Sequence, residues 1–172
     1  MPDNFYRQLG TGVASLTFGV ALSIFIYAAA SGIVSGLQAW FLFATSFLLM
    51  LRFWWRYNEL FVRFMPSRTF WHFLFDFAIS FFGILTVLTV GDLRTWALLS
   101  ALAMLLSAIR CGLSWHEAKT AKPMLKKTFL GAIAMLVIMG AVYALVPIIG
   151  HVLLAEAVFI LVLIFVIYSS RK

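Results

Sequence analysis

Four polar side chains recur at four-residue steps inside an otherwise apolar stretch: Arg68, His72, Asp76 and Ser80. On an α-helix this spacing places them along one face. An ionised carboxylate at the centre of a bilayer costs about 2.5–3.5 kcal/mol even on the mildest insertion scales, so we expect Asp76 to face protein or water rather than lipid. Two interpretations of Asp76 stand side by side: an ion or proton site with His72 one turn away, or one half of an ion pair that fixes helix packing.

An ion pair at Asp76 needs a cation from another helix. Arg52 is the first candidate, because it lies deepest in the apolar stretch that precedes Asp76 in the chain. Arg110, near the end of a later apolar stretch, is the second, and its alternative is to snorkel to the lipid headgroups. We therefore take Arg52, His72 and Arg110 as candidate charge partners of Asp76.

The composition defines the class of protein. Of the 172 residues, 64% are hydrophobic and only 11% are charged, and the mean hydropathy is +1.04. No soluble domain of this size can bury so much apolar surface, so we predict an all-α integral membrane protein. The net charge of +7 does not indicate a nucleic-acid partner, because the basic residues flank apolar runs as membrane topology requires. The single cysteine, Cys111, excludes an intrachain disulfide and a cysteine metal cluster.

Six apolar segments are each long enough to cross a bilayer, which needs about 20 residues. The short connections between them indicate one six-helix transmembrane domain over residues 1–172. The first segment also has the pattern of a signal peptide that ends in three alanines. Its amino-terminal flank has one arginine offset by an aspartate, however, so we interpret it as the first spanning helix. The predicted helices are 12–34, 37–60, 69–90, 94–115, 127–149 and 151–169.

The basic residues are distributed asymmetrically between the two sides of such a bundle. Placing the amino terminus in the cytoplasm leaves only Arg94 of the 13 Lys and Arg residues on the outer side, in line with the positive-inside rule. We therefore predict a multi-pass protein of the cell membrane, with both termini cytoplasmic and the lipid bilayer as a partner. The residues expected to contact lipid headgroups are Arg56, Arg63, Lys126 and Lys127.

Small and hydroxyl side chains share one face of the first predicted helix, at Ser15, Gly19 and Ser23. Such a face lets another helix approach closely, and helix packing is one interpretation. The other is a pore wall, because small and hydroxyl groups leave room for water and ions. Gly32 and Gly36 near the end of this helix form a G-x-x-x-G pattern, which is typical of helix dimerisation.

The junction between the second and third predicted helices resembles a known family. Phe53, Trp54, Tyr57 and Phe61 follow the spacing of an aromatic motif in the small prokaryotic relatives of the endolysosomal six-helix potassium channels, where a histidine stands at the position of Tyr57. The helix count, the cytoplasmic termini and the basic loop between the fourth and fifth helices are also similar. The family's Phe-Ser-Asp motif on the first helix is absent from this sequence. The resemblance implies a homotetramer whose first helix lines a cation pore.

Motifs of the common enzyme classes are missing: there is no HExxH, no phosphate-binding loop and no dinucleotide fingerprint. We therefore expect no enzyme activity, no metal site and no cofactor. We predict an oligomeric membrane channel or transporter for monovalent cations, with potassium first among them. The alternatives are a non-transporting membrane subunit or scaffold, and an effector that disrupts membranes. The predicted ion pathway comprises Ser15, Gly19, Ser23, Asp76 and Ser80.

Overall fold

The computed structural model describes residues 2–62, 69–116 and 121–170. These residues form six α-helices and a short π-helical segment, η1, which continues the second helix; no strand occurs among them. The predicted all-α class is therefore confirmed. The elements are α1 (Pro2–Ala30), α2 (Gly36–Arg56), η1 (Tyr57–Val62), α3 (Phe70–Leu88), α4 (Leu93–Leu113), α5 (Lys122–Leu145) and α6 (His151–Ser170).

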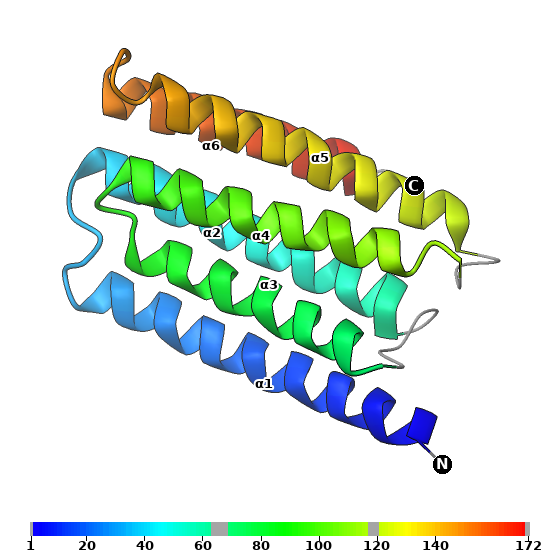
Figure 1. The fold of residues 1–172 in the computed structure, drawn as a ribbon. Helices are drawn as coiled ribbons and strands as arrows, with labels where there is room; N and C mark the ends of the chain where they lie inside the picture. Colours follow the sequence, from blue (N-terminus) through cyan, green and yellow to red (C-terminus); the bar gives the residue numbers. More distant parts are fainter. Residues whose placement is uncertain (1, 63–68, 117–120, 171–172) are drawn as a thin grey trace.

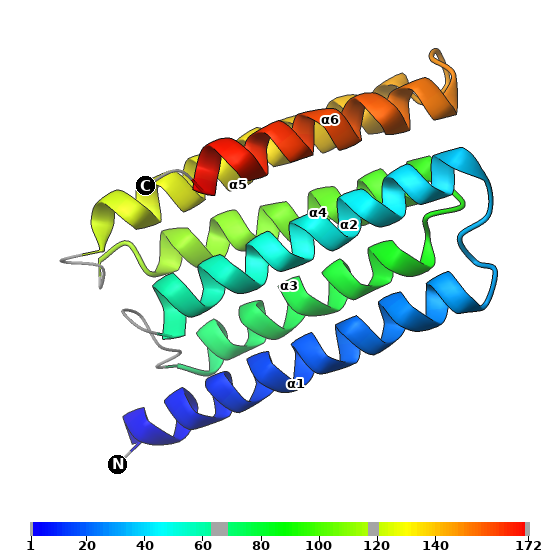
Figure 2. The ribbon, with the colours of Figure 1, turned by 180° about the vertical axis from the view of Figure 1, so that it is seen from behind.

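The six helices run side by side in one elongated bundle (Figures 1 and 2). α4 packs against both α3 and α5, α6 packs on α2, and α1 packs on α3 at the edge of the bundle. The amino terminus of α1 and the carboxyl terminus of α6 lie at the same end. That end also carries Arg56 in the last turn of α2 and Lys122 at the start of α5, so we call it the basic end; the opposite end, where Arg94 lies, is the far end.

Five helices of the described part of the chain are long and apolar enough to cross a membrane. The apolar part of α1, Ser15–Ala30, is shorter than the about 20 residues that a span usually needs. The fold is therefore a helical bundle in which five helices are candidate membrane spans by length and composition. They are Gly36–Leu60, Phe70–Leu88, Leu93–Leu113, Lys122–Leu145 and His151–Tyr168.

Two glycines set the turn after α1. Gly32 and Gly36 have φ angles of 78° and 80°, a left-handed conformation that residues with a Cβ atom rarely adopt. α1 therefore ends at Ala30 rather than at the predicted residue 34. At its other end, α1 begins at Pro2 rather than at the predicted residue 12. The predicted G-x-x-x-G dimerisation face is wrong, because these glycines form a turn instead of sharing a helix surface.

α5 begins and ends earlier than the predicted helix 127–149. It starts at Lys122 and carries Pro123 in its first turn, where the missing N–H costs nothing because the first N–H groups of a helix have no partner within it. It ends at Leu145, shortly before Pro147, which has no N–H to continue the hydrogen bonds of the helix. The basic residues near the start of α5 are consequently held on a helix instead of in a loop.

The hydrophobic core surrounds Trp96 of α4, whose side chain is fully buried. Met135 and Met139 of α5 and Val158 of α6 belong to the same core. α1 contributes Phe25, whose ring makes edge-on contacts with two phenylalanine rings of α2. This packing holds α2, α3 and α4 together and so positions the polar side chains described below.

Candidate functional site

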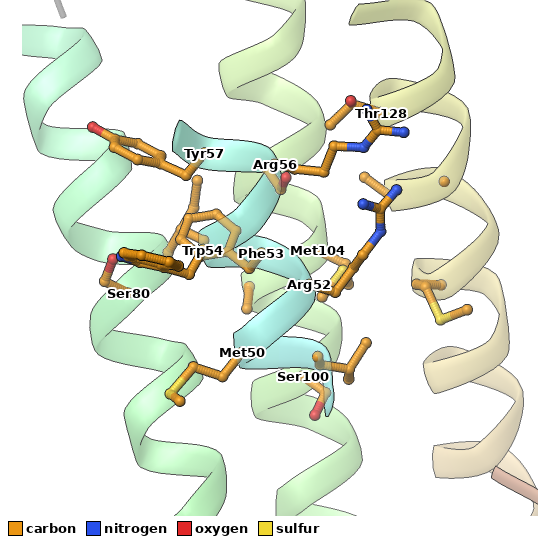
Figure 3. Close-up of a pocket in the computed structure, with 18 of the residues that line it drawn as sticks. Met50, Arg52, Phe53, Trp54, Arg56, Tyr57, Ser80, Ser100, Met104 and Thr128 are labelled. Carbon is orange, nitrogen blue, oxygen red and sulfur yellow. The ribbon is translucent and has the colours of Figure 1, made fainter. Parts of the chain in front are cut away.

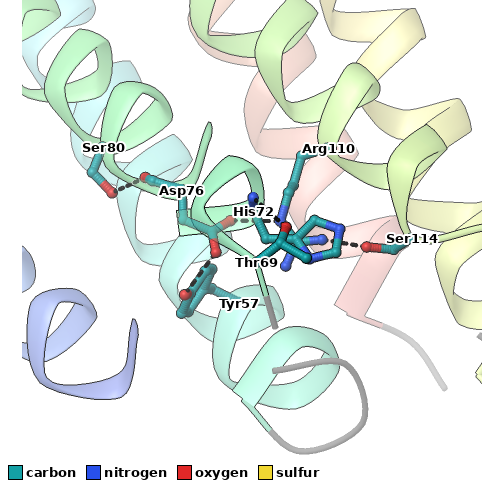
Figure 4. Close-up of polar contacts among 7 residues, drawn as sticks. All are labelled: Tyr57, Thr69, His72, Asp76, Ser80, Arg110 and Ser114. Carbon is teal, nitrogen blue, oxygen red and sulfur yellow. Dashed lines mark hydrogen bonds and ion pairs between the residues drawn. The ribbon is translucent and has the colours of Figure 1, made fainter. Parts of the chain in front are cut away.

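A buried ion pair joins α3 to α4 toward the basic end (Figure 4). The Nε atom of Arg110 lies 2.9 Å from Oδ1 of Asp76. The two residues are only 1% and 6% exposed, respectively. Each charge is thus neutralised by the other inside the protein, which a buried ion requires because water no longer solvates it.

Two hydroxyl groups complete this network (Figure 4). The Tyr57 hydroxyl donates to Oδ2 of Asp76 at 3.1 Å, and Nη1 of Arg110 donates to the Ser114 hydroxyl. Tyr57 is the first residue of η1, and Ser114 directly follows the last turn of α4. Both carboxylate oxygens of Asp76 therefore accept a hydrogen bond from another part of the chain. We call Tyr57, Asp76, Arg110 and Ser114 the charged network.

The other polar residues of the predicted row on α3 lie one turn to each side of Asp76. The Ser80 hydroxyl donates to the main-chain carbonyl of Asp76 at 3.0 Å. His72 is 5% exposed, and its backbone N–H donates to Thr69 Oγ1 at 3.4 Å, which caps the start of α3. The predicted face of α3 is therefore present, and its Asp76 faces protein as expected; Arg68 lies outside the described residues.

Arg110, the second candidate partner, forms the ion pair that the structure records for Asp76. The expectation that Arg110 snorkels to the headgroups is wrong, because its side chain is buried between helices. Arg52, the first candidate, lines a cavity. Sequence reasoning misses the hydroxyl partners Tyr57 and Ser114. The signal for Tyr57 was a tyrosine at interfacial depth, whose hydroxyl needs a hydrogen-bond partner once the ring is buried.

The small-residue face of α1, defined by Ser15, Gly19 and Ser23, is exposed on the outside of the bundle. The Ser23 hydroxyl donates to the Gly19 carbonyl at 3.0 Å. A Cβ atom added at Gly19 would meet no atom of a neighbouring helix within 4 Å. α1 instead buries Ala21 and Phe25 against its neighbours. The structure thus divides the predicted ion pathway between two places, an outer face of α1 and a buried face of α3.

A cavity of about 780 Å³ extends from the basic end into the bundle, and all six helices contribute to its lining (Figure 3). Most of the lining is apolar. Figure 3 shows the side chains of Arg52 and Arg56 extending from α2 toward the neighbouring helix that carries Thr128. The charged residues that line the cavity are Arg52, Arg56, Asp76 and Lys127.

The residues predicted to contact lipid headgroups lie at the basic end wherever the structure describes them. Arg56 forms an ion pair with Glu59, three residues further along the chain, in which the nitrogen and oxygen atoms are 2.8 Å apart. Lys126 and Lys127 are exposed on the second turn of α5. Arg63 lies outside the described residues. These cations are placed at the depth where headgroups would surround an inserted bundle.

Toward the far end, an uncharged network joins the same helices. Trp96 Nε1 donates to the Ser46 hydroxyl at 2.8 Å, and the Thr86 hydroxyl lies 3.3 Å from the same oxygen. Thr86 also donates to the Gly83 carbonyl at 2.7 Å. Ser46, Thr86 and Trp96 are all buried. We call these three residues the neutral network; sequence reasoning does not predict it.

At the far end, Asp92 caps α4. Its carboxylate accepts hydrogen bonds from the Arg94 N–H at 3.1 Å and from the Thr95 hydroxyl. The hydrogen bond from Thr95 lowers the pKa of the Asp92 carboxyl below its usual value. The Arg94 guanidinium lies over the ring of Tyr143, 4.7 Å from its centroid. These contacts fix the start of α4 and attach it to α5.

Known proteins offer no direct guide to the role of these features. Within residues 2–62, 69–116 and 121–170, no group of three or more His, Cys, Asp or Glu residues is placed to hold a metal ion. No family model matches the chain, and neither does any curated protein or solved structure. The function must therefore be inferred from the charged network, the cavity and the exposed face of α1.

Proposed function

We propose that this chain is a six-span membrane protein with cytoplasmic termini that conducts monovalent cations, potassium first among them, as an oligomer. The path runs between subunits, along the small-residue face of α1. The observation that carries the proposal is the exposure of Ser15, Gly19 and Ser23 on the outside of the bundle. A face of small and hydroxyl groups leaves room for hydrated ions when copies of the chain bring it to a common axis.

The length of α1 and the distribution of charge support the proposed topology. α1 contains 29 residues, which at 1.5 Å per residue gives about 44 Å, more than the hydrocarbon thickness of about 30 Å. With α1 as a span the number of crossings is even, in agreement with the two termini at one end of the bundle (Figure 1). By sequence position, Arg94 is the one basic residue of 13 that falls at the far end, so the basic end is assigned to the cytoplasm.

The internal cavity is an unsuitable route for a cation. Arg52, Arg56 and Lys127 line it, and like charges repel strongly where the effective dielectric constant is low. The carboxylate in its wall, Asp76, already pairs with Arg110. The proposed path therefore lies outside the single bundle rather than through it.

The aromatic motif adds a second line of support. Phe53, Trp54 and Tyr57 resemble the corresponding residues of six-helix potassium channels, whose first helix lines the pore of a homotetramer. α3, the helix on which α1 packs, carries Asp76. In the proposed assembly the charged network thus supports the pore-lining helix from behind, and Asp76 does not itself bind the ion.

A second candidate is a non-transporting membrane subunit or scaffold. The observation that favours it is the engagement of both oxygens of Asp76, by Arg110 and by Tyr57. A carboxylate held in this way locks helices together and leaves no oxygen turned toward a passing ion. In this case the exposed face of α1 receives a helix of another protein, as small-residue faces do in membranes.

Potassium efflux from liposomes that contain the purified protein tests the proposal. We compare wild type with Gly19→Leu, which fills the face of α1, and with Val20→Leu, a matched change at an exposed position about 100° around the helix. Flux above that of empty vesicles, lost in Gly19→Leu and kept in Val20→Leu, is the expected result. Asp76→Asn is measured beside them after its folding has been checked.

The other outcomes are equally informative. No flux from wild type under any applied potential or pH would reject conduction and favour the scaffold. Flux that survives Gly19→Leu unchanged would place the path elsewhere than on α1. Cross-linking of the protein in vesicles reports the oligomeric state, and a monomer would exclude a path between subunits.

A further inference from the structure

We propose that the cavity at the basic end is a binding site for a single-chain anionic amphiphile, that is, one acyl chain with a carboxylate or phosphate headgroup. The headgroup lies between α2 and α5, and the chain extends into the bundle. This site is separate from the proposed ion path on α1, and binding to it does not require conduction.

The charge of the cavity selects an anion. Arg52 and Arg56 of α2 and Lys127 of α5 line its basic end, and Figure 3 shows both arginine side chains directed from α2 to the same side of the cavity. The carboxylates of Glu59 and Asp76 are paired with Arg56 and with Arg110, respectively. Four cations, including Arg110, are thus set against two carboxylates, and this excess of positive charge attracts an anionic headgroup. Arginine and lysine are the usual donors to carboxylate and phosphate oxygens.

The depth of the lining residues matches the two parts of such a molecule. Arg52 and Arg56 stand in the last two turns of α2, close to the basic end, whereas Leu49 and Met50 lie nearer the middle of the same helix. Met135 likewise lies two turns deeper in α5 than Lys127. The charged residues of the lining therefore lie toward the basic end and its deeper part is uncharged, as an amphiphile oriented like a membrane lipid requires.

The shape and size of the cavity suit one flexible chain. On α5, three of the residues that line the cavity have small side chains or none: Gly131, Ala132 and Ala134. Methionines at Met104 and Met135 provide unbranched side chains that adapt to a flexible ligand. The volume of about 780 Å³ falls within the range of roughly 300–1,000 Å³ that holds one small ligand. Burial of the chain supplies the affinity, and the cations supply the preference for an anionic headgroup.

Direct binding to the delipidated protein in a non-ionic detergent tests this site. The probes are oleate and oleoyl lysophosphatidate, with oleyl alcohol as the uncharged analogue of equal chain length and inorganic phosphate as the headgroup alone. We expect both anionic amphiphiles to bind at least tenfold more tightly than oleyl alcohol, and phosphate not to compete with them. Equal affinity for oleyl alcohol would overturn the role of the cations, and competition by phosphate would identify a free-anion site instead.

Matched variants locate the site. Lys127→Gln, which removes a lining charge, is compared with Lys126→Gln, which removes the neighbouring charge outside the lining. Lys127→Gln and Arg52→Gln should each weaken oleate binding about tenfold, Arg52→Lys should restore it in part, and Lys126→Gln should leave it unchanged.

Filling the cavity provides a test that does not depend on charge. Ala134→Phe adds a large side chain at an exposed position of the lining, and it should reduce the binding of both oleate and oleyl alcohol. Thermal unfolding of each variant confirms that it is folded. Wild-type affinity in folded Ala134→Phe, or the same affinity in Lys127→Gln and Lys126→Gln, would overturn the proposal. These measurements need no ion flux, so their failure is distinct from a failure of the proposed conduction.

Discussion

The charged network and the neutral network solve the same problem in two ways. Each takes one side chain from α2 or its continuation, one from α3 and one from α4: Tyr57, Asp76 and Arg110 in the first, Ser46, Thr86 and Trp96 in the second. Asp76 and Thr86 are ten residues apart on α3, so the two networks are separated by about 15 Å along the helix. Three helices are thus tied together twice, once toward the basic end and once toward the far end.

The difference between them lies in what remains when one partner is lost. An unpaired charge in a low-dielectric interior is very unfavourable, and the ion pair therefore depends on both of its members. An unpaired hydroxyl or indole N–H costs much less, and hydrogen bonds between membrane helices contribute only about 0.6 kcal/mol on average. The charged network is consequently the more specific link and the more fragile one.

The largest effect is expected from breaking the ion pair. Asp76→Asn leaves Arg110 buried without its counter-charge and should lower the free energy of unfolding by about 3–5 kcal/mol. The measurement is denaturant unfolding of the purified protein in detergent micelles. The double variant Asp76→Leu with Arg110→Met removes both charges and should lie close to wild type or above it. A double variant as unstable as Asp76→Asn would show that the pair contributes more than mutual neutralisation.

The next effect concerns the hydroxyl that completes the charged network. Tyr57→Phe removes the donor to Oδ2 of Asp76 while keeping the ring, and it should lower the free energy of unfolding by about 1.5–3 kcal/mol, as expected for a hydrogen bond to a charged group. Tyr27→Phe is the matched control, because Tyr27 is 61% exposed. Its effect should stay within about 0.5 kcal/mol. Equal effects in the two variants would remove Tyr57 from the network.

A smaller effect is expected in the neutral network. Ser46→Ala removes the acceptor of the Trp96 N–H and should lower the free energy of unfolding by about 0.6 kcal/mol, and by no more than about 1.7 kcal/mol. Ser35→Ala is the control, because Ser35 is exposed and its side chain makes no capping hydrogen bond. A loss in Ser46→Ala as large as that in Asp76→Asn would contradict the distinction drawn between the networks.

The smallest effect is a pH dependence at the far end, outside both networks. Because the pKa of Asp92 is lower in the folded protein than in the unfolded chain, where it is about 3.9, its contribution to stability is present above that value. The contribution is lost as the pH falls through the folded pKa. Unfolding of wild type and Asp92→Asn should therefore differ most near neutral pH and converge in acid. A difference that grows as the pH falls would contradict the assignment of Asp92 as an ionised cap.

Part of the charged network follows from the sequence. A carboxylate inside an apolar run must face protein or water, and the four-residue spacing predicts the face of α3 that carries Asp76. The choice between Arg52 and Arg110 does not follow, because it depends on how α2 and α4 are rotated about their axes. The neutral network is hidden for a related reason: its hydrogen bonds join residues 40 and 50 positions apart, and isolated serines and threonines occur on every helix.

The helix boundaries divide in the same way. Apolar length predicts the number and order of the helices, because each must approach the thickness of a bilayer. Glycines and prolines decide where α1 and α5 end, since Gly32 adopts a left-handed conformation and Pro147 disfavours continuation of α5. The effects of these glycine and proline residues are local, but the sequence alone does not determine whether a given glycine or proline lies within a helix or just after its end.

By itself, the sequence determined that this chain forms helices apolar enough to cross a membrane, with one strongly basic end and an aspartate that needs a partner inside the bundle. These properties follow from hydropathy and charge, which are sums over residues and do not depend on their contacts. Only the tertiary structure decided that Arg110 and Tyr57 are the partners, that the small-residue face of α1 points outward, and that Arg52 and Lys127 meet in one cavity. Those properties depend on the rotation and packing of helices that are distant in the chain, and side-chain contacts across the bundle set them.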